Sequence, residues 1–273
     1  MKSSLVKRIV TAVILAPIFI WSIFNIPKEY FSYFLLLFVA LGCWEFSRLI
    51  NIRNLILRAT YSLFVVALSV YLSDLTLAFS LVLYLSVVWW LVNLFWVISY
   101  PQKTKLWFDP LPARIVSGIM LLVPMWLSLS YLHLNYGPAW FLLLILIVWA
   151  ADSGAYFVGR SLGRNKLSPF VSPKKTIEGV IGGATFSILM MVGFFALYVN
   201  DQDPMYENYL GYLILTLVVA WASVLGDLYE SLFKRVSGIK DSGQILPGHG
   251  GILDRIDSLT AAAPFFVLGL ELL

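Results

Sequence analysis

The chain has 273 residues, of which 60% are hydrophobic and only 12% are charged, with a formal net charge of +4 and a mean hydropathy of +0.86. A soluble domain carries about 25% charged residues, since polar groups must cover its core. The composition therefore excludes an ordinary soluble domain and predicts an all-α, polytopic integral membrane protein. The single cysteine, Cys43, excludes an intrachain disulfide.

A membrane-spanning helix needs about 20 largely apolar residues, within a range of about 17–25. In chain order, this length predicts nine spans, near residues 9–26, 30–50, 55–73, 75–100, 113–134, 138–157, 179–199, 209–229 and 258–273. The opening MKSSLVKR and the apolar run after it resemble a signal sequence, but the apolar run is long and lacks a convincing small-x-small cleavage site. We interpret it as a retained first span.

The positions of lysine and arginine predict the orientation, because these residues accumulate in short cytoplasmic loops. With nine spans and a cytoplasmic N-terminus, 18 of the 19 basic residues lie on the inner side, and only Lys28 lies outside. The outer loop 200–208 is acidic and has no basic residue. The pattern therefore predicts a cytoplasmic N-terminus and a C-terminus outside the cell membrane.

The two halves of the chain differ in their charged residues. Residues 1–135 form five predicted spans with few buried ionisable groups, Glu45 being the main one, so we interpret this region as a transmembrane scaffold. Residues 136–273 form four predicted spans with two long, glycine-rich and charged cytoplasmic loops. Chemistry is expected in this C-terminal region.

The acidic residues of the C-terminal region are predicted to meet at one depth, the cytoplasmic membrane boundary. Asp152 lies at the inner end of the sixth span, and Asp227 lies at the inner end of the eighth. Asp254 and Asp257 begin the ninth span from the same side. A charge at the hydrocarbon centre costs at least about 2.5–3.5 kcal/mol, so charges beside a span are retained for a reason.

Helical spacing brings these residues closer together. Residues at i, i+3, i+4 and i+7 share one helix face, which is the spacing of Asp227, Glu230, Ser231 and Lys234. Asp254 and Asp257 share another face. Carboxylate oxygens suit Mg²⁺, whereas zinc prefers histidine or cysteine, and the chain has only two histidines. The alternative is that each aspartate pairs with a nearby base such as Arg255 or is solvated at the interface.

The segment SPKKTIEG (172–179) offers the complementary positive charge. Ser172 is expected to cap a helix with Pro173 at its first position, leaving free N–H groups for an anion. Lys174 and Lys175 would then face a phosphate, although two lysines here also fit the cytoplasmic bias of basic residues.

The loop DSGQILPGHGG (241–251) is rich in glycine, which lets the backbone approach a ligand closely. A glycine loop alone is weak evidence for a phosphate site. Its His249 could donate to a phosphate or bond to the backbone of the loop.

Together these residues resemble a known family. The segment SLFKRVSGIKDSGQILPGHGGILDRID (231–257) resembles the signature of the phosphatidate cytidylyltransferases, the CDP-diacylglycerol synthases. The segments DSGAYFVGRSLGRNKL (152–167) and SPKKTIEGVIGG (172–183) are also similar to that family. The resemblance is specific in the C-terminal half, whereas the N-terminal half matches only in its hydrophobic character.

This resemblance implies a Mg²⁺-dependent enzyme that converts CTP and phosphatidic acid to CDP-diacylglycerol and pyrophosphate at the cytoplasmic face of the inner membrane. Asp227, Asp254 and Asp257 are expected to hold one or two cations, and Lys234, Arg235 and Arg255 to orient the lipid head group. The residues expected to bind the nucleotide are Asp152, Lys174, Lys175, Thr176, Glu178, Lys240, Asp241, His249, Gly250 and Gly251. We expect no nucleic-acid partner, and the bundle offers helix faces for a homodimer.

Two other functions compete with this one. A CTP-dependent polyprenol or phytol kinase would phosphorylate an alcohol, need a base for the hydroxyl group and release CDP. A transporter would place charged residues along a path near the bilayer midplane. Here the charges gather at one predicted face and no inverted repeat is visible, which disfavours a transporter.

Overall fold

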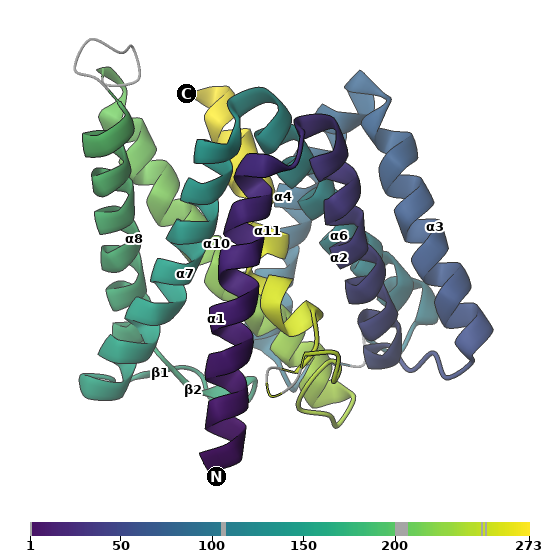
Figure 1. Cartoon of the computed structure of the whole chain (residues 1–273). Coiled ribbons are helices and arrows are strands. Elements are labelled where there is room, and N and C mark those ends of the chain that lie inside the picture. Colours follow the sequence, from purple (N-terminus) through teal and green to yellow (C-terminus); the bar gives the residue numbers. More distant parts are fainter. Residues whose placement is uncertain (1, 105–107, 200–206, 247, 249) are drawn as a thin grey trace.

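The computed structural model describes residues 2–104, 108–199, 207–246, 248 and 250–273. Within these residues, nine helices of 19 to 28 residues run up and down the molecule, which confirms the all-α prediction (Figure 1). They are α1 (Lys2–Asn25), α2 (Lys28–Leu49), α3 (Leu55–Ser73), α4 (Thr76–Ser99), α6 (Leu111–Tyr131), α7 (Pro138–Ser161), α8 (Ile177–Tyr198), α10 (Tyr209–Val236) and α11 (Leu253–Leu272). The π-helix η1 (Leu132–Tyr136) follows α6 directly.

Seven of the helices in the described part of the chain are long and apolar enough to cross a membrane; α6 and η1 together make one of them. The exceptions are α1, which contributes the shorter apolar stretch Val13–Asn25, and α11. Asp254, Arg255 and Asp257 lie in the first turns of α11 and lower its hydropathy.

The charged loops gather at one end of the bundle. The start of α1 and the hairpin of β1 (Lys166–Ser168) and β2 (Ser172–Thr176) lie at the lower end in Figure 1, as does the segment between α10 and α11. The C-terminus lies at the opposite end. Because successive long helices run in opposite directions, every second connection lies at this lower end, and segments distant in sequence meet there.

Two central helices carry the core. Every residue of α6 from Leu121 to Ser130 is buried, and so is every residue of α11 from Ile256 to Pro264. A helix that is covered on all sides belongs to the interior of a bundle. Asp257 lies in this buried part of α11 with a relative exposure of only 9%. The acidic N-terminal part of α11 is therefore inserted between other helices.

The prediction that Ser172 caps a helix was wrong. Residues Ser172–Thr176 form β2, which pairs antiparallel with β1, and α8 begins only at Ile177. Thr176 is the residue that caps α8, because its hydroxyl oxygen accepts a hydrogen bond from the Gly179 N–H at 3.1 Å. Proline restricts the residue before it to extended conformations, so a Ser-Pro pair fits a strand as well as a helix start.

Helices α7 and α8 pack with their backbones unusually close. A Cβ atom on Gly183 would lie 2.5 Å from the Ala151 carbonyl oxygen, and one on Gly154 would lie 2.7 Å from the Gly182 carbonyl oxygen. Small residues at an interface allow membrane helices to approach and gain van der Waals contact, since lipid tails are as apolar as leucine. This close approach holds the β1–β2 hairpin, which connects the two helices, in a defined position.

The close contact predicts different effects for two glycines of α8. Gly183→Ala should destabilise the protein by about 1–3 kcal/mol, because the added methyl group overlaps the α7 backbone. Gly193→Ala is the matched control, since a Cβ at this position meets no heavy atom within 4 Å, and alanine there should be neutral or slightly stabilising. Thermal unfolding of the two purified variants in detergent measures the difference, and equal midpoints would contradict the packing argument.

Candidate active site

The first part of the site is an ion-pair network between α10 and α11. The Lys234 ammonium group lies 2.6 Å from Glu230 Oε2 and 2.8 Å from Asp254 Oδ1. The Glu230 side chain is fully buried, and the Lys234 side chain is 12% exposed. Because burial of a charge without a partner is costly, this lysine and its two carboxylates depend on one another. Lys234 therefore joins the two helices that carry the three predicted metal ligands.

Asp254 also holds the loop that precedes α11. Its Oδ2 accepts hydrogen bonds from the Ser242 N–H at 3.0 Å, the Ser242 hydroxyl at 2.9 Å and the Gly251 N–H at 2.8 Å. A carboxylate that accepts several backbone and hydroxyl donors fixes the position of the groups that donate to it. The glycine-rich loop is thus closed around Asp254.

The glycines of this loop are required by space and by conformation. Gly250 has a φ of +85°, and a Cβ there would lie 2.7 Å from Asp254 Oδ2. A Cβ on Gly251 would overlap the Glu45 carboxylate and the Ser242 hydroxyl. Both predicted glycines therefore contact carboxylate-bearing residues of the protein itself.

The second part of the site joins the hairpin to α10. The Lys175 ammonium group of β2 lies 2.7 Å from Asp227 Oδ2, and the Ser231 hydroxyl lies 3.2 Å from Asp227 Oδ1. The side chains of Lys175 and Asp227 are 22% and 28% exposed, so this pair is accessible to a ligand. The structure brings a predicted phosphate-binding lysine directly to a predicted metal ligand.

Two further predicted residues, Asp152 and Asp257, lie within electrostatic reach of this pair. Asp152 of α7, which is exposed, interacts with Asp227, Lys175 and Arg255. Asp257 interacts with Asp227 and Asp152, and its side chain also contacts Glu230. Carboxylates from α7, α10 and α11 are therefore concentrated in one region, as the sequence predicted. Such a concentration of like charge favours the binding of cations.

The donor set fits a hard cation such as Mg²⁺, because every acidic group in this region offers carboxylate oxygen. Among the described residues, however, no group of three or more His, Cys, Asp or Glu side chains is arranged to surround one ion. Asp227 and Asp254 instead each contact a lysine ammonium group. Lys175 and Lys234 therefore supply the positive charge that compensates these two carboxylates.

Other predicted residues lie away from these contacts. Glu178 accepts hydrogen bonds from the Arg164 N–H and from the backbone and side chain of Asn165, so it closes the turn after α7. Arg235 donates to the Val171 carbonyl oxygen at 3.0 Å. Lys174, Lys240, Asp241 and Arg255 are exposed, as are Asp152 and Arg235. His249 lies outside the described residues, and Thr176 is buried at its helix cap.

Glu45 of α2 belongs to the predicted scaffold region, but the structure places it against the loop between α10 and α11. Its Oε2 accepts hydrogen bonds from the Leu253 N–H at 2.8 Å and from the Ser242 hydroxyl at 3.2 Å. Glu45 is 2% exposed, so its charge depends on these donors. A carboxylate inside an otherwise apolar span was the signal that could have identified it. Ser242, which bridges Glu45 and Asp254, had no comparable signal.

The chain matches known proteins over nearly its full length. A model of the cytidylyltransferase family matches residues 6–273. A phosphatidate cytidylyltransferase of Haemophilus influenzae is 39% identical over 95% of this chain and 96% of its own length. A protein of the same name from Pseudomonas aeruginosa is 40% identical over 95% and 94%, and one from Bacillus subtilis is 45% identical over 50% and 49%. By this near-complete match, the chain belongs to the cytidylyltransferase family.

Proposed function

We propose that this chain transfers the cytidylyl group of CTP to phosphatidic acid, forming CDP-diacylglycerol and releasing pyrophosphate. The observation that carries the proposal is the lysine–carboxylate cluster built by β2, α7, α10 and α11 at one end of an apolar bundle. Such a cluster suits a reaction between two polyanions, one of which is anchored in lipid. The relatives named phosphatidate cytidylyltransferase support the same reaction.

The proposed topology has nine membrane spans, with the N-terminus and the cluster on the cytoplasmic side of the inner membrane. It is supported by the distribution of lysine and arginine and by the position of the start of α1 at the same end as the β1–β2 hairpin. CTP would reach this end from the cytoplasm, while the acyl chains of the acceptor remain in the bilayer. The exposed apolar faces of the outer helices are available to lipid or to a second copy of the chain.

The reaction forms a bond between a phosphate oxygen of phosphatidic acid and the α-phosphorus of CTP, and it breaks the bond between the α- and β-phosphates. A phosphate monoester has its second pKa near 6, so the attacking oxygen is largely deprotonated at pH 7 and needs no dedicated base. The protein must instead hold two anions together in line and compensate their charge.

The lysines and Arg255 would hold the two anions and compensate their charge. Lys175 contacts Asp227 and is partly exposed, so a triphosphate that binds it would replace the carboxylate as its partner. Lys174, on the same strand, is exposed and available to the outer phosphates. Lys234 is held by Glu230 and Asp254, so it would act at a fixed position. Arg255, at the start of α11, would orient the lipid phosphate.

Release of Lys175 to the triphosphate would leave the Asp227 carboxylate available for a cation. We propose that Asp227, Asp254 and Asp257 hold Mg²⁺ and that Asp152 contacts a second cation. When bound, the ion would neutralise phosphate charge and stabilise the leaving pyrophosphate. The carboxylates position this charge, and Glu230 keeps Lys234 beside them.

The first test is product analysis of the purified protein in detergent with labelled CTP, phosphatidic acid and Mg²⁺. We expect CDP-diacylglycerol and pyrophosphate in equal amounts, and loss of both when a chelator removes the metal. Formation of CDP only when an isoprenoid alcohol replaces phosphatidic acid would identify a kinase and contradict the proposal. Turnover that continues in excess chelator would contradict the role of the metal.

Single substitutions test the carboxylates. Asp227→Asn, Asp254→Asn and Asp257→Asn should each lower kcat by at least about 100-fold, because each change removes a charge that holds a cation beside the phosphates. Asp74→Asn is the matched control, since Asp74 lies in the turn after α3 and should leave activity unchanged. The variants must reach the membrane in equal amounts, as measured by immunoblot. Near-normal turnover in any of the three would remove that residue from the site.

A further inference from the structure

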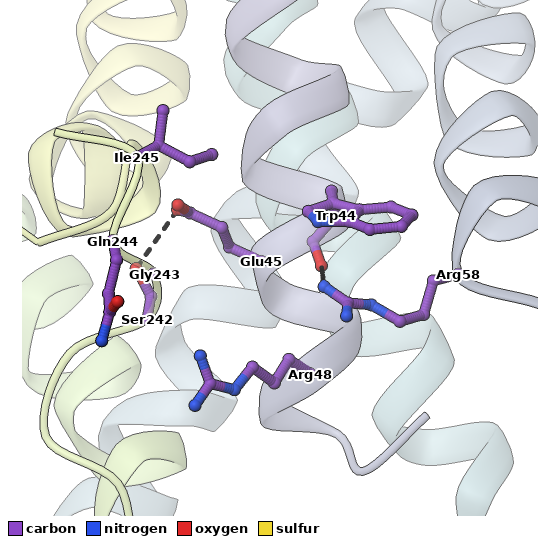
Figure 2. Close-up of a pocket in the computed structure, with 8 residues that line it drawn as sticks. All are labelled: Trp44, Glu45, Arg48, Arg58, Ser242, Gly243, Gln244 and Ile245. Carbon is purple, nitrogen blue, oxygen red and sulfur yellow. Dashed lines mark hydrogen bonds between the residues drawn. The ribbon is translucent and has the colours of Figure 1, made fainter. Parts of the chain in front are cut away.

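A polar pocket lies against the loop that Asp254 holds. It has a volume of about 310 Å³ and is lined by Trp44, Glu45, Arg48, Arg58, Ser242, Gly243, Gln244 and Ile245. Figure 2 shows α2 and α3 contributing one wall and the loop 242–245 contributing the opposite wall. None of the arginines in this pocket was among the predicted site residues.

Arg58 is held in one orientation at this pocket. Its Nε donates to the Ser47 hydroxyl at 3.0 Å, and one terminal nitrogen donates to the Trp44 carbonyl oxygen at 2.8 Å. Its guanidinium carbon also lies 4.0 Å from the centre of the Trp44 ring. These contacts fix the guanidinium plane and leave part of its donor set unused. An arginine held in this way is preorganised for a planar or tetrahedral oxyanion.

Arg48 brings a second positive charge to the same pocket. It interacts electrostatically with Arg58, and Figure 2 shows its guanidinium extending from α2 toward Gln244. Among the described residues, neither arginine forms an ion pair with a carboxylate. Two like charges at one partly enclosed site repel each other, and a bound anion would relieve this repulsion.

The remaining ionisable group of the pocket does not cancel this charge. Glu45 points its Oε2 at the Leu253 N–H and the Ser242 hydroxyl, so that oxygen is already bound on the loop side. The three ionisable side chains of the pocket, two arginines and one glutamate, leave it with a net positive charge. Gln244 and the backbone of the glycine-containing loop add further polar groups.

We propose that this pocket binds a phosphate group, through the guanidinium groups of Arg48 and Arg58, as a site separate from the Lys175–Asp227 pair. Paired guanidinium groups recognise phosphate because their N–H groups match its oxygens. The phosphate can belong to the head group of an anionic phospholipid or to a nucleotide. Both share the chemistry that the pocket recognises, and the pocket lies at the same end of the bundle as the candidate active site.

The pocket shares residues with the candidate active site. Ser242 lines the pocket, and its N–H and hydroxyl bind Asp254. Glu45 lines the pocket and accepts from the first backbone N–H of α11. A phosphate bound between the arginines would therefore contact the loop whose far side holds Asp254.

Native mass spectrometry of the detergent-purified full chain tests the proposal, with one ligand supplied at a time so that no turnover is needed. The ligands are phosphatidic acid, CTP and diacylglycerol with the same acyl chains, which lacks the phosphate. Arg48→Gln should weaken binding of phosphatidic acid or of CTP about 10-fold or more, because a charge-assisted hydrogen bond is lost. Arg53→Gln is the matched control, since Arg53 is an exposed arginine of the next loop that does not line the pocket.

The ligand that loses affinity identifies the source of the phosphate. Weaker phosphatidic acid binding with unchanged CTP binding assigns the pocket to a lipid head group, and the reverse assigns it to the nucleotide. Equal affinities of the Arg48→Gln and Arg53→Gln variants for both ligands would overturn the proposal. An equal loss of diacylglycerol binding would also overturn it, because the pocket would then recognise the glyceride and not the phosphate. Since each ligand is bound alone, these results do not depend on whether the chain catalyses cytidylyl transfer.

Discussion

The Lys234 ammonium group lies between Glu230 and Asp254, at 2.6 Å and 2.8 Å from their oxygens, in a region where the Glu230 side chain has no exposure. Removing one partner from a buried ion pair typically costs about 3–5 kcal/mol, because the other charge then lacks compensation. This contact joins α10 to α11, and Asp254 in turn binds the loop before α11 through Ser242 and Gly251. The orientation of the loop and the acidic start of α11 therefore depend on one lysine.

The same constraint explains why the polar residues lie at one end of the bundle. Away from water, each charge needs a partner within the protein, and the apolar centres of α6 and α11 offer few. At the lower end, backbone N–H groups, hydroxyl groups and lysines are available because the loops and the hairpin meet there (Figure 1). Close packing of α7 on α8 at Gly154 and Gly183 holds the hairpin that supplies Lys175. Apolar packing thus fills the centre of the bundle, whereas the polar groups lie at its lower end.

The loop between α10 and α11 connects two polar regions of different character. On one side, Asp254 and its neighbours form an acidic region compensated by lysines. On the other side, Arg48 and Arg58 form a positively charged pocket against Trp44. An enzyme that brings together a nucleotide and an anionic lipid needs both kinds of site, since phosphates require positive charge and cations require carboxylates. Glu45 links the two regions, because its carboxylate binds Ser242 and the first N–H of α11.

The sequence by itself determined the long apolar helices, because about 20 apolar residues in a row have no stable alternative to a helix in a bilayer. It also determined that Asp152, Asp227, Asp254 and Asp257 would approach one another, since they begin or end spans on the same predicted side. Spacing along α10 placed Lys234 on the helix face of Glu230, and the structure has this contact.

Only the tertiary structure decided which charges pair. The cap of α8 is Thr176 and not the predicted Ser172, because β2 pairs with β1, a contact that Ser-Pro does not encode locally. The contact of Lys175 with Asp227 joins residues 52 positions apart, and that of Glu45 with Ser242 joins residues 197 positions apart. Hydropathy reports how deep a residue lies in the membrane but not its rotation about the bundle axis, so these partners follow only from the way the helices pack.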